Sequence, residues 1–162
     1  MANNIDEVLV RIRADSLCAV YPPREVPAIQ THLKLPEDLK RFYSLCGGLK
    51  LFENSNYSFE IISPELLIPS NIKILGQQYI EDASSSWYIV ASSGQDQFIS
   101  IDLSEAKNGR CYDSFMDAHA VVGSCAIVAN TFTNLLVGLY NSKGDYLYWL
   151  KPEFKKIGDA YD

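Results

Sequence analysis

The segment from Leu35 to Gly48, LPEDLKRFYSLCGG, constrains the fold more than any other stretch of the chain. It starts with Leu-Pro, and Pro36 suits the first position of a helix, with two acids following where they complement the positive end of the helix dipole. Four apolar side chains then recur at the spacing of one helix face: Leu39, Phe42, Tyr43 and Cys46. Gly47 stands where a left-handed residue would end the helix, and Gly47 or Gly48 is expected to have a positive φ and to cap it. The pattern predicts a helix of about three turns, which packing must stabilise because isolated helices of this length are marginal in water.

Two further helices are predicted before this segment. The stretch 3–15, NNIDEVLVRIRAD, carries one apolar stripe, and Asn3 or Asn4 can cap its start. The stretch 24–33, REVPAIQTHL, has a similar spacing of apolar residues, although Pro27 is tolerable there only in the first turn. Three helices are therefore expected at the start of the chain.

The apolar period changes from 3.6 to 2 after Gly48. The stretches 49–52 and 57–62, LKLF and YSFEII, alternate as strands do. From Trp87 to Phe115, three further strands joined by two turns predict an antiparallel meander. These segments together predict a central sheet.

The last strong element is the stretch 130–144, NTFTNLLVGLYNSKG, which predicts a helix capped by Asn130 or Thr131. Helices first, strands in the middle and a helix last predict an α+β fold. We expect one domain over residues 1–162, in which N-terminal helices and a C-terminal helix pack on a central, mostly antiparallel sheet.

Composition limits the partners that the chain can bind. The formal net charge is −6 and the pI is about 4.9, whereas bulk binding of nucleic acid needs a basic face. The start, MANNIDEVLV, lacks the basic residues and apolar core of a signal peptide, and the longest weakly apolar run, AVVGSCAIVA, is about half as long as a spanning helix. We expect a soluble cytoplasmic protein, monomeric or homodimeric, that binds neither nucleic acid nor membranes.

The four cysteines show no C-x-x-C spacing. Without a secretion signal, they are expected to be free thiols. Cys46 and Cys125 lie in apolar surroundings and are expected in the core.

His119 is the histidine with carboxylates close in sequence, Asp113 and Asp117 in DSFMDAHA. A carboxylate–imidazole pair can do acid–base chemistry. No metal-ligand spacing and no phosphate-binding glycine motif accompanies it. A polar loop that leaves a strand is the preferred interpretation, so no catalytic, cofactor-binding or metal-binding residue is predicted. A small acid–base enzyme built on these three residues stays the alternative from a different class.

The order of these motifs resembles the SUKH superfamily, the Smi/Knr-type domains. The family pattern is Leu-Pro, a Leu three residues after the Pro, an aromatic or aliphatic residue three further on, and a glycine-rich end. The matching residues here are Leu35, Pro36, Leu39, Phe42, Gly47 and Gly48. WYIVASSGQDQFISIDL resembles the central hairpin of the family and IVANTFTNLLVGLY its C-terminal helix, so the resemblance runs from about 26 to 140. The family usually has Asn-Gly where this chain has Cys46-Gly47-Gly48.

The resemblance implies a non-enzymatic binding protein. Bacterial members are similar to immunity proteins, which are made beside a toxin and bind its toxic domain. Eukaryotic members look like intracellular regulatory adaptors of cell-wall synthesis and signalling, usually with long disordered flanks. This chain shows no such flanks. An immunity protein with a cognate toxin domain as its partner is therefore expected, and the adaptor is the alternative.

The acidic segment from Glu81 to His119 is the predicted partner-binding region. It holds seven acids and two bases and so carries −5 of the net charge of −6. Toxic domains that act on nucleic acid, such as nucleases, must be basic at their working surface, and an acidic inhibitor would associate with them quickly by electrostatic steering. Trp87 and Tyr112 are candidate aromatic anchors, although Trp87 fits a core position as well. The full predicted set is Glu81, Asp82, Trp87, Asp96, Asp102, Glu105, Tyr112, Asp113 and Asp117.

Overall fold

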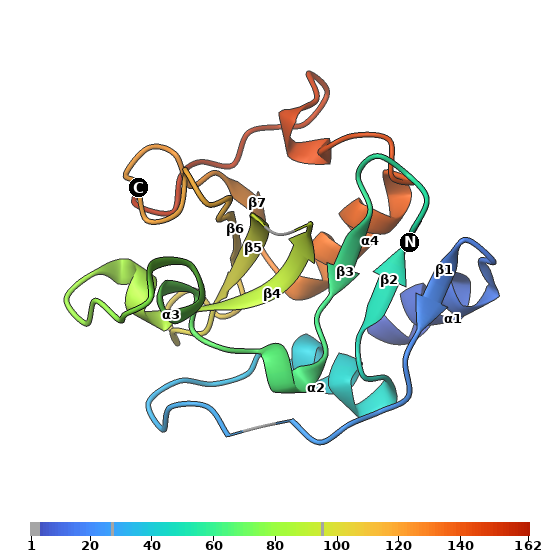
Figure 1. Cartoon of the computed structure of the whole chain (residues 1–162), viewed down its shortest axis with the longest axis horizontal. Helices are drawn as coiled ribbons and strands as arrows, with labels where there is room; N and C mark the ends of the chain where they lie inside the picture. The colour runs from blue at the N-terminus through green and yellow to red at the C-terminus, as the bar shows by residue number, and fades with distance from the viewer. Residues whose placement is uncertain (1–3, 27, 95) are drawn as a thin grey trace.

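The computed structural model describes residues 4–26, 28–94 and 96–162, and within them the chain forms four α-helices and one seven-stranded sheet (Figure 1). The helices are α1 (Ile5–Ala14), α2 (Glu37–Leu45), α3 (Ser70–Leu75) and α4 (Phe132–Asn141). The strands are β1 (Cys18–Val20), β2 (Leu49–Leu51), β3 (Phe59–Ile61), β4 (Trp87–Ser93), β5 (Gln97–Asp102), β6 (Cys111–Asp113) and β7 (Ile127–Ala129). Three short 3₁₀ turns complete the list: η1 (Pro64–Leu66), η2 (Ala83–Ser86) and η3 (Tyr148–Leu150).

The sheet is a continuous meander, because each strand pairs antiparallel with the next strand of the chain. This confirms the predicted α+β class and extends the predicted three-strand meander at both ends. β1 and β7 were not predicted from the sequence. Each has only three residues, and its pairing with β2 or β6 defines it.

The main core lies between α1, α2, α4 and one face of the sheet, here called the inner face. Phe42 of α2 packs edge-to-face on Phe132 of α4, with ring centroids 4.9 Å apart. Asp38 joins the same two helices, since its carboxylate accepts hydrogen bonds of 2.8 Å from the backbone N–H and the hydroxyl of Thr133. The predicted N-terminal caps of α1 and α4 are confirmed: Asn4 accepts a hydrogen bond from the Glu7 N–H and Thr131 from the Asn134 N–H. In the described residues, none of the helices has the length and hydropathy to cross a membrane.

The helix predicted over 24–33 does not form. Pro27 lies outside the described residues, and the residues described from 21 to 30 have no regular structure. In the sequence, the proline at position 27 disfavours helical dihedrals at Val26, the residue before it, which opposes a helix over this stretch. Val26 and Ile29 nevertheless pack against the core, and Leu33 is buried in it. The apolar spacing therefore reflects an extended connection that covers the core.

The corner after α2 differs from its prediction. α2 ends at Leu45, and Cys46 follows in an extended conformation with φ −157°, so no left-handed glycine caps the helix. The positive φ expected of Gly47 or Gly48 occurs at Gly48, at 101°. At Gly47 the constraint is space, because a Cβ there would lie 2.2 Å from the Pro22 carbonyl oxygen. Pro36 stands one residue before the helix instead of at its first position.

The other face of the sheet, here called the outer face, carries a smaller layer over β4, β5 and β6. α3 belongs to this layer and was not predicted from the sequence. It spans only six residues, enters from Pro69 and ends at Gly76, which has φ 81°. A tertiary layer, rather than helix propensity, therefore stabilises it.

Candidate partner-binding surface

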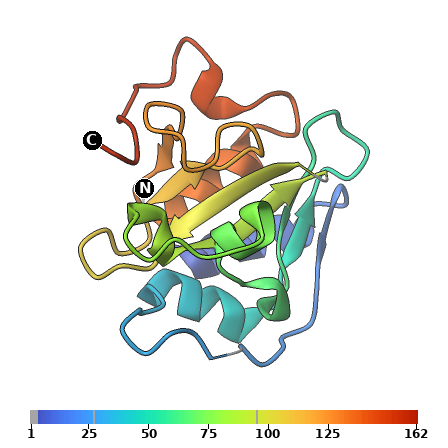
Figure 2. The same ribbon diagram turned by 60° about the vertical axis from the view of Figure 1, so that its left-hand side comes forward.

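Three segments cover the outer face and are here called the outer-face cover: residues 68–86, 114–125 and 157–162. Figure 2, which turns this side toward the viewer, shows α3 in front of the strands and the segment after β6 above it. Hydrogen bonds connect all three segments. His119 Nε2 lies 2.8 Å from Asn71 Oδ1, and the Tyr161 hydroxyl donates to Asp82 at 2.7 Å. The Cys125 N–H donates to Asp159 at 2.8 Å, so the cover is one connected structure.

A second, small core lies beneath this cover. It contains Trp87, Tyr112, Cys125, Ile127 and Ala160, with Tyr161 packed against it. The rings of Trp87 and Tyr112 are tilted at a centroid distance of 4.6 Å. Burial raises the pKa of the Cys125 thiol to about 11, which keeps it protonated and unreactive at neutral pH.

Three of the predicted partner-binding residues lie in this interior. Trp87 and Tyr112 are fully buried, and Asp102 is 4% exposed. The Tyr112 hydroxyl donates to Asp102 at 2.7 Å, and the Ser86 hydroxyl donates to the same carboxylate at 2.8 Å. These side chains therefore support the cover from below and are not available to touch a partner.

A chain of hydrogen bonds runs through the cover, and along it each group donates to the next in the same direction. The Asn71 amide nitrogen donates to Gln78 and Ser84, which leaves Asn71 Oδ1 to accept from His119 Nε2. Neutral His119 then carries its proton on Nε2, and Nδ1 accepts from the Ser114 hydroxyl at 3.1 Å.

The chain continues beyond both ends of this group. Ser114 Oγ lies 2.6 Å from Ser100 Oγ, which lies 2.7 Å from Ser70 Oγ. At the other end the Ser84 hydroxyl donates to Asp82 at 2.6 Å. Burial raises the pKa of Asp82, but hydrogen bonds from Ser84 outweigh it, so the pKa lies below its usual value and the chain ends on a carboxylate.

His119 does not meet the carboxylates that the enzyme alternative needs. Its ring nitrogens contact Ser114 and Asn71, and burial lowers its pKa to about 4. Asp113 instead accepts from the Phe115 N–H and from Trp149 Nε1, and burial raises its pKa. Asp117 is exposed. The predicted polar loop after β6 is present, but its histidine is buried in it as a structural group.

The remaining predicted acids fall in two places. Glu81, Asp82 and Asp117 belong to the outer-face cover, and Asp96 borders it because the Met116 N–H donates to the Asp96 carbonyl at 2.8 Å. Glu105 lies apart, on the turn between β5 and β6. That turn packs toward the start of α2, as the Lys34 N–H donates to the Leu103 carbonyl at 3.3 Å.

The outer-face cover also concentrates exposed apolar side chains. Of the thirteen large apolar residues exposed in the described part of the chain, eight belong to it: Ile72, Leu75, Tyr79, Ile80, Met116, Val121, Val122 and Ile157. The cover makes up less than a quarter of the chain. These exposed apolar residues were not predicted as a binding surface from the sequence. The apolar runs ILGQQYI and AVV, which lie between the predicted elements, indicate them.

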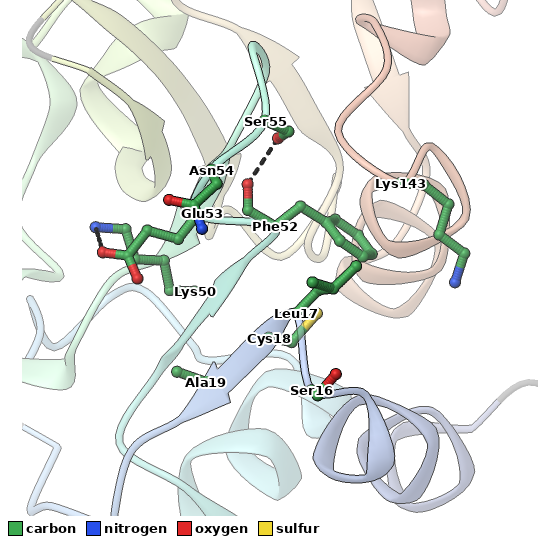
Figure 3. Close-up of a pocket in the computed structure, with 10 residues that line it drawn as sticks. All are labelled: Ser16, Leu17, Cys18, Ala19, Lys50, Phe52, Glu53, Asn54, Ser55 and Lys143. Carbon is green, nitrogen blue, oxygen red and sulfur yellow. Dashed lines mark hydrogen bonds and ion pairs between the residues drawn. The ribbon is translucent and has the colours of Figure 1, made fainter.

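A hollow of about 390 Å³ lies beside β1 and is another candidate site (Figure 3). Ten residues line it: Ser16, Leu17, Cys18, Ala19, Lys50, Phe52, Glu53, Asn54, Ser55 and Lys143. Lys50 pairs with Glu53 at 3.4 Å, and the Lys143 ammonium lies 3.7 Å from the centroid of the Tyr140 ring. Both lysines of the hollow are thus engaged with their neighbours, and the part of the hollow that the structure describes holds no nucleophile paired with a base.

Within 4–26, 28–94 and 96–162, no group of three or more histidine, cysteine, aspartate or glutamate side chains is arranged to hold an ion. All four cysteines are free, and Cys46 and Cys125 are buried as predicted.

Comparison with known proteins gives two matches. The model of the SMI1 / KNR4 family (SUKH-1) matches residues 29–138. The chain is also 38% identical over 159 residues to a protein of Bacillus subtilis (strain 168) named "Immunity protein YokJ". That alignment covers 98% of this chain and 96% of the relative.

Proposed function

Because the chain belongs to the SMI1 / KNR4 family (SUKH-1), we propose that it is an immunity protein that binds the toxic domain of a cognate toxin and blocks it. It acts inside the cell that makes it, where the toxin would otherwise do harm. The block is steric, through binding, and not chemical.

The observation that carries the proposal is the similarity to an immunity protein over nearly the whole of both chains. The similarity is therefore not confined to one segment of the chain. The name of the relative also favours an immunity protein over a regulatory adaptor.

The side chains support binding rather than catalysis. His119 is enclosed by Ser114 and Asn71 and is 4% exposed, so substrate cannot reach its ring without unfolding the cover. Its pKa of about 4 also makes it a weak base at neutral pH.

A neutralisation assay tests the proposed function. The toxin domain encoded beside the gene for this chain is expressed in a sensitive host, with and without the chain, and growth is measured. We expect the chain to restore growth. If it does not protect against that toxin domain, the immunity proposal is wrong for this pair.

Stoichiometry separates a binder from an enzyme. The purified toxin domain is titrated with the purified chain, and its residual activity is measured. We expect inhibition to need about one chain per toxin domain, because a binder is consumed by its complex. Complete inactivation by a small fraction of an equivalent would instead support the acid–base enzyme.

A further inference from the structure

We infer that the outer-face cover is the docking surface of this chain, and that its partner is a protein with a basic face around an apolar centre. The inference rests on the proposed function, since the toxin domain is that partner. The binding region predicted over residues 81–119 is thereby redefined as a set of side chains on one side of the molecule.

The apolar part of the surface provides the contact area. Ile80 is 83% exposed and Val122 is 73% exposed, and they belong to two cover segments that the His119–Asn71 hydrogen bond joins. A soluble protein rarely gathers so many large apolar side chains on one face unless another molecule covers them. Interface centres are apolar and aromatic, and Tyr79, which is 45% exposed, adds an aromatic ring.

The charge of the surface selects the partner. The three cover segments contain five acids and one base, Lys73, which gives −4 of the net charge of −6. Asp96 adds a further acid at the border. Two copies of this face would repel each other. The face would also repel nucleic acid and an anionic membrane. A partner protein with basic side chains around an apolar centre would complement both the negative charge and the exposed apolar side chains of this surface.

The cover is also rigidly supported. Its segments are joined by the chain of hydrogen bonds from Ser70 to Asp82 and lie on the small core of Trp87 and Tyr112. A surface that is ordered before binding loses less conformational entropy in the complex. The buried polar residues of the outer face thus gain a role: they present the apolar side chains in a fixed arrangement.

Two variants, each with two substitutions, test the surface. The kinetics of their binding to an inactivated form of the toxin domain are measured. Ile80→Ser combined with Val122→Ser removes apolar contact and should weaken the equilibrium affinity at least about tenfold. Glu81→Lys combined with Asp117→Lys reverses the rim charge and should slow association at least about tenfold at low salt, with a smaller effect at high salt.

Matched controls lie elsewhere on the molecule. Val10→Ser changes an apolar side chain of α1 that is 68% exposed, and Glu105→Lys reverses an exposed acid on the β5–β6 turn. Both should bind the toxin domain like the parent chain. Circular dichroism and melting temperature verify that every variant is folded, which the exposure of the changed side chains favours.

The possible results separate the surface from the function. If the parent chain binds and protects while both cover variants bind equally well, the surface is wrong and the immunity function stands. Loss of binding in the controls but not in the cover variants overturns the surface in the same way. A parent chain that neither binds nor protects overturns the proposed function itself. A parent chain that dimerises, and becomes monomeric on changing Ile80 and Val122, would assign the surface to a second copy instead.

Discussion

His119 shows how one residue can be misread from its neighbours in sequence. Two acids stand within six residues of it, yet the fold turns the ring toward Ser114 and Asn71. Both ring nitrogens are used by the neutral form, in which Nε2 donates and Nδ1 accepts. Protonation would place a second donor against the Ser114 hydroxyl, in a site where burial already disfavours the charge. His119 is therefore a structural residue that is sensitive to acid.

The stability of the chain should fall on mild acidification because of His119. Its pKa in the folded state is about 4, against an ordinary value of 6.5. Between these values the unfolded chain binds a proton that the folded chain does not, so stability is complete above pH 6.5 and decreases as the pH falls toward 4. The loss between pH 7 and pH 5 should be roughly 2 kcal/mol, measured by urea denaturation.

The decisive measurement is how the free energy of unfolding changes with pH, because His119→Gln changes the absolute stability as well. That variant should lose most of the decrease between pH 7 and pH 5. His32→Gln, which changes an exposed histidine, should keep it. An unchanged slope in His119→Gln would show that the acid sensitivity comes from other groups.

At the scale of the element, the corner between α2 and β2 depends on two glycines with different constraints. Gly47 needs space, because the connection at Pro22 passes against it. Gly48 needs both space and a positive φ: a Cβ there would lie 2.6 Å from the Ile61 carbonyl oxygen, and its φ is 101°. The corner is therefore specified by neighbours that are distant in sequence, in addition to the end of the helix itself.

Alanine substitutions should separate the two constraints. Gly94 has φ 76° and open space around its Cβ position, so Gly94→Ala should cost on the order of 1 kcal/mol of stability, from conformation alone. Gly47→Ala and Gly48→Ala should each cost more, by roughly 1–3 kcal/mol, because the backbone must shift to admit the methyl group. Denaturant midpoints measure all three, and equal losses at the three positions would contradict the steric reading of the corner.

At the scale of the whole molecule, the last residues complete the sheet. The Ile127 N–H donates to the Gly158 carbonyl and the Ala160 N–H to the Cys125 carbonyl, both at 2.9 Å. Ala126 and Asp159 form an antiparallel bridge. The edge of β7 is thereby covered, and Ala160 belongs to the small core around Trp87. An uncovered edge strand would be open to pairing with another chain.

Removal of residues 158–162 should therefore expose both an edge and a core. We expect the melting temperature to fall by about 5 °C or more, for a loss on the order of 2 kcal/mol in a chain of this size. Association that increases with concentration should appear in sedimentation or light scattering. Tyr161→Phe is the matched control, because it removes only the hydroxyl that donates to Asp82 and should cost much less. A truncated chain that melts like the parent and shows no new association would remove this role from the C-terminal segment.

The parts of the fold that the sequence predicted are those with local causes. α1, α2 and α4 follow from apolar stripes, and the caps at Asn4 and Thr131 follow from single side chains that bond to the next turn. The strands from β2 to β6 follow from alternation and turns. The α+β class could be predicted from the order of these elements along the chain alone.

The candidate binding surface had no such local cause, and only the tertiary structure decided it. Trp87, Tyr112 and Asp102 look like surface candidates in the sequence but lie beneath the cover, while Ile80 and Val122 occupy loops and are exposed. The physical reason is that burial depends on which segments meet across the sheet. Asn71 meets His119, and Asp82 meets Tyr161, over 48 and 79 residues of chain. The sequence by itself thus determined the elements and the acidity of the chain, whereas long-range pairing on the outer face determined which side chains a partner can reach.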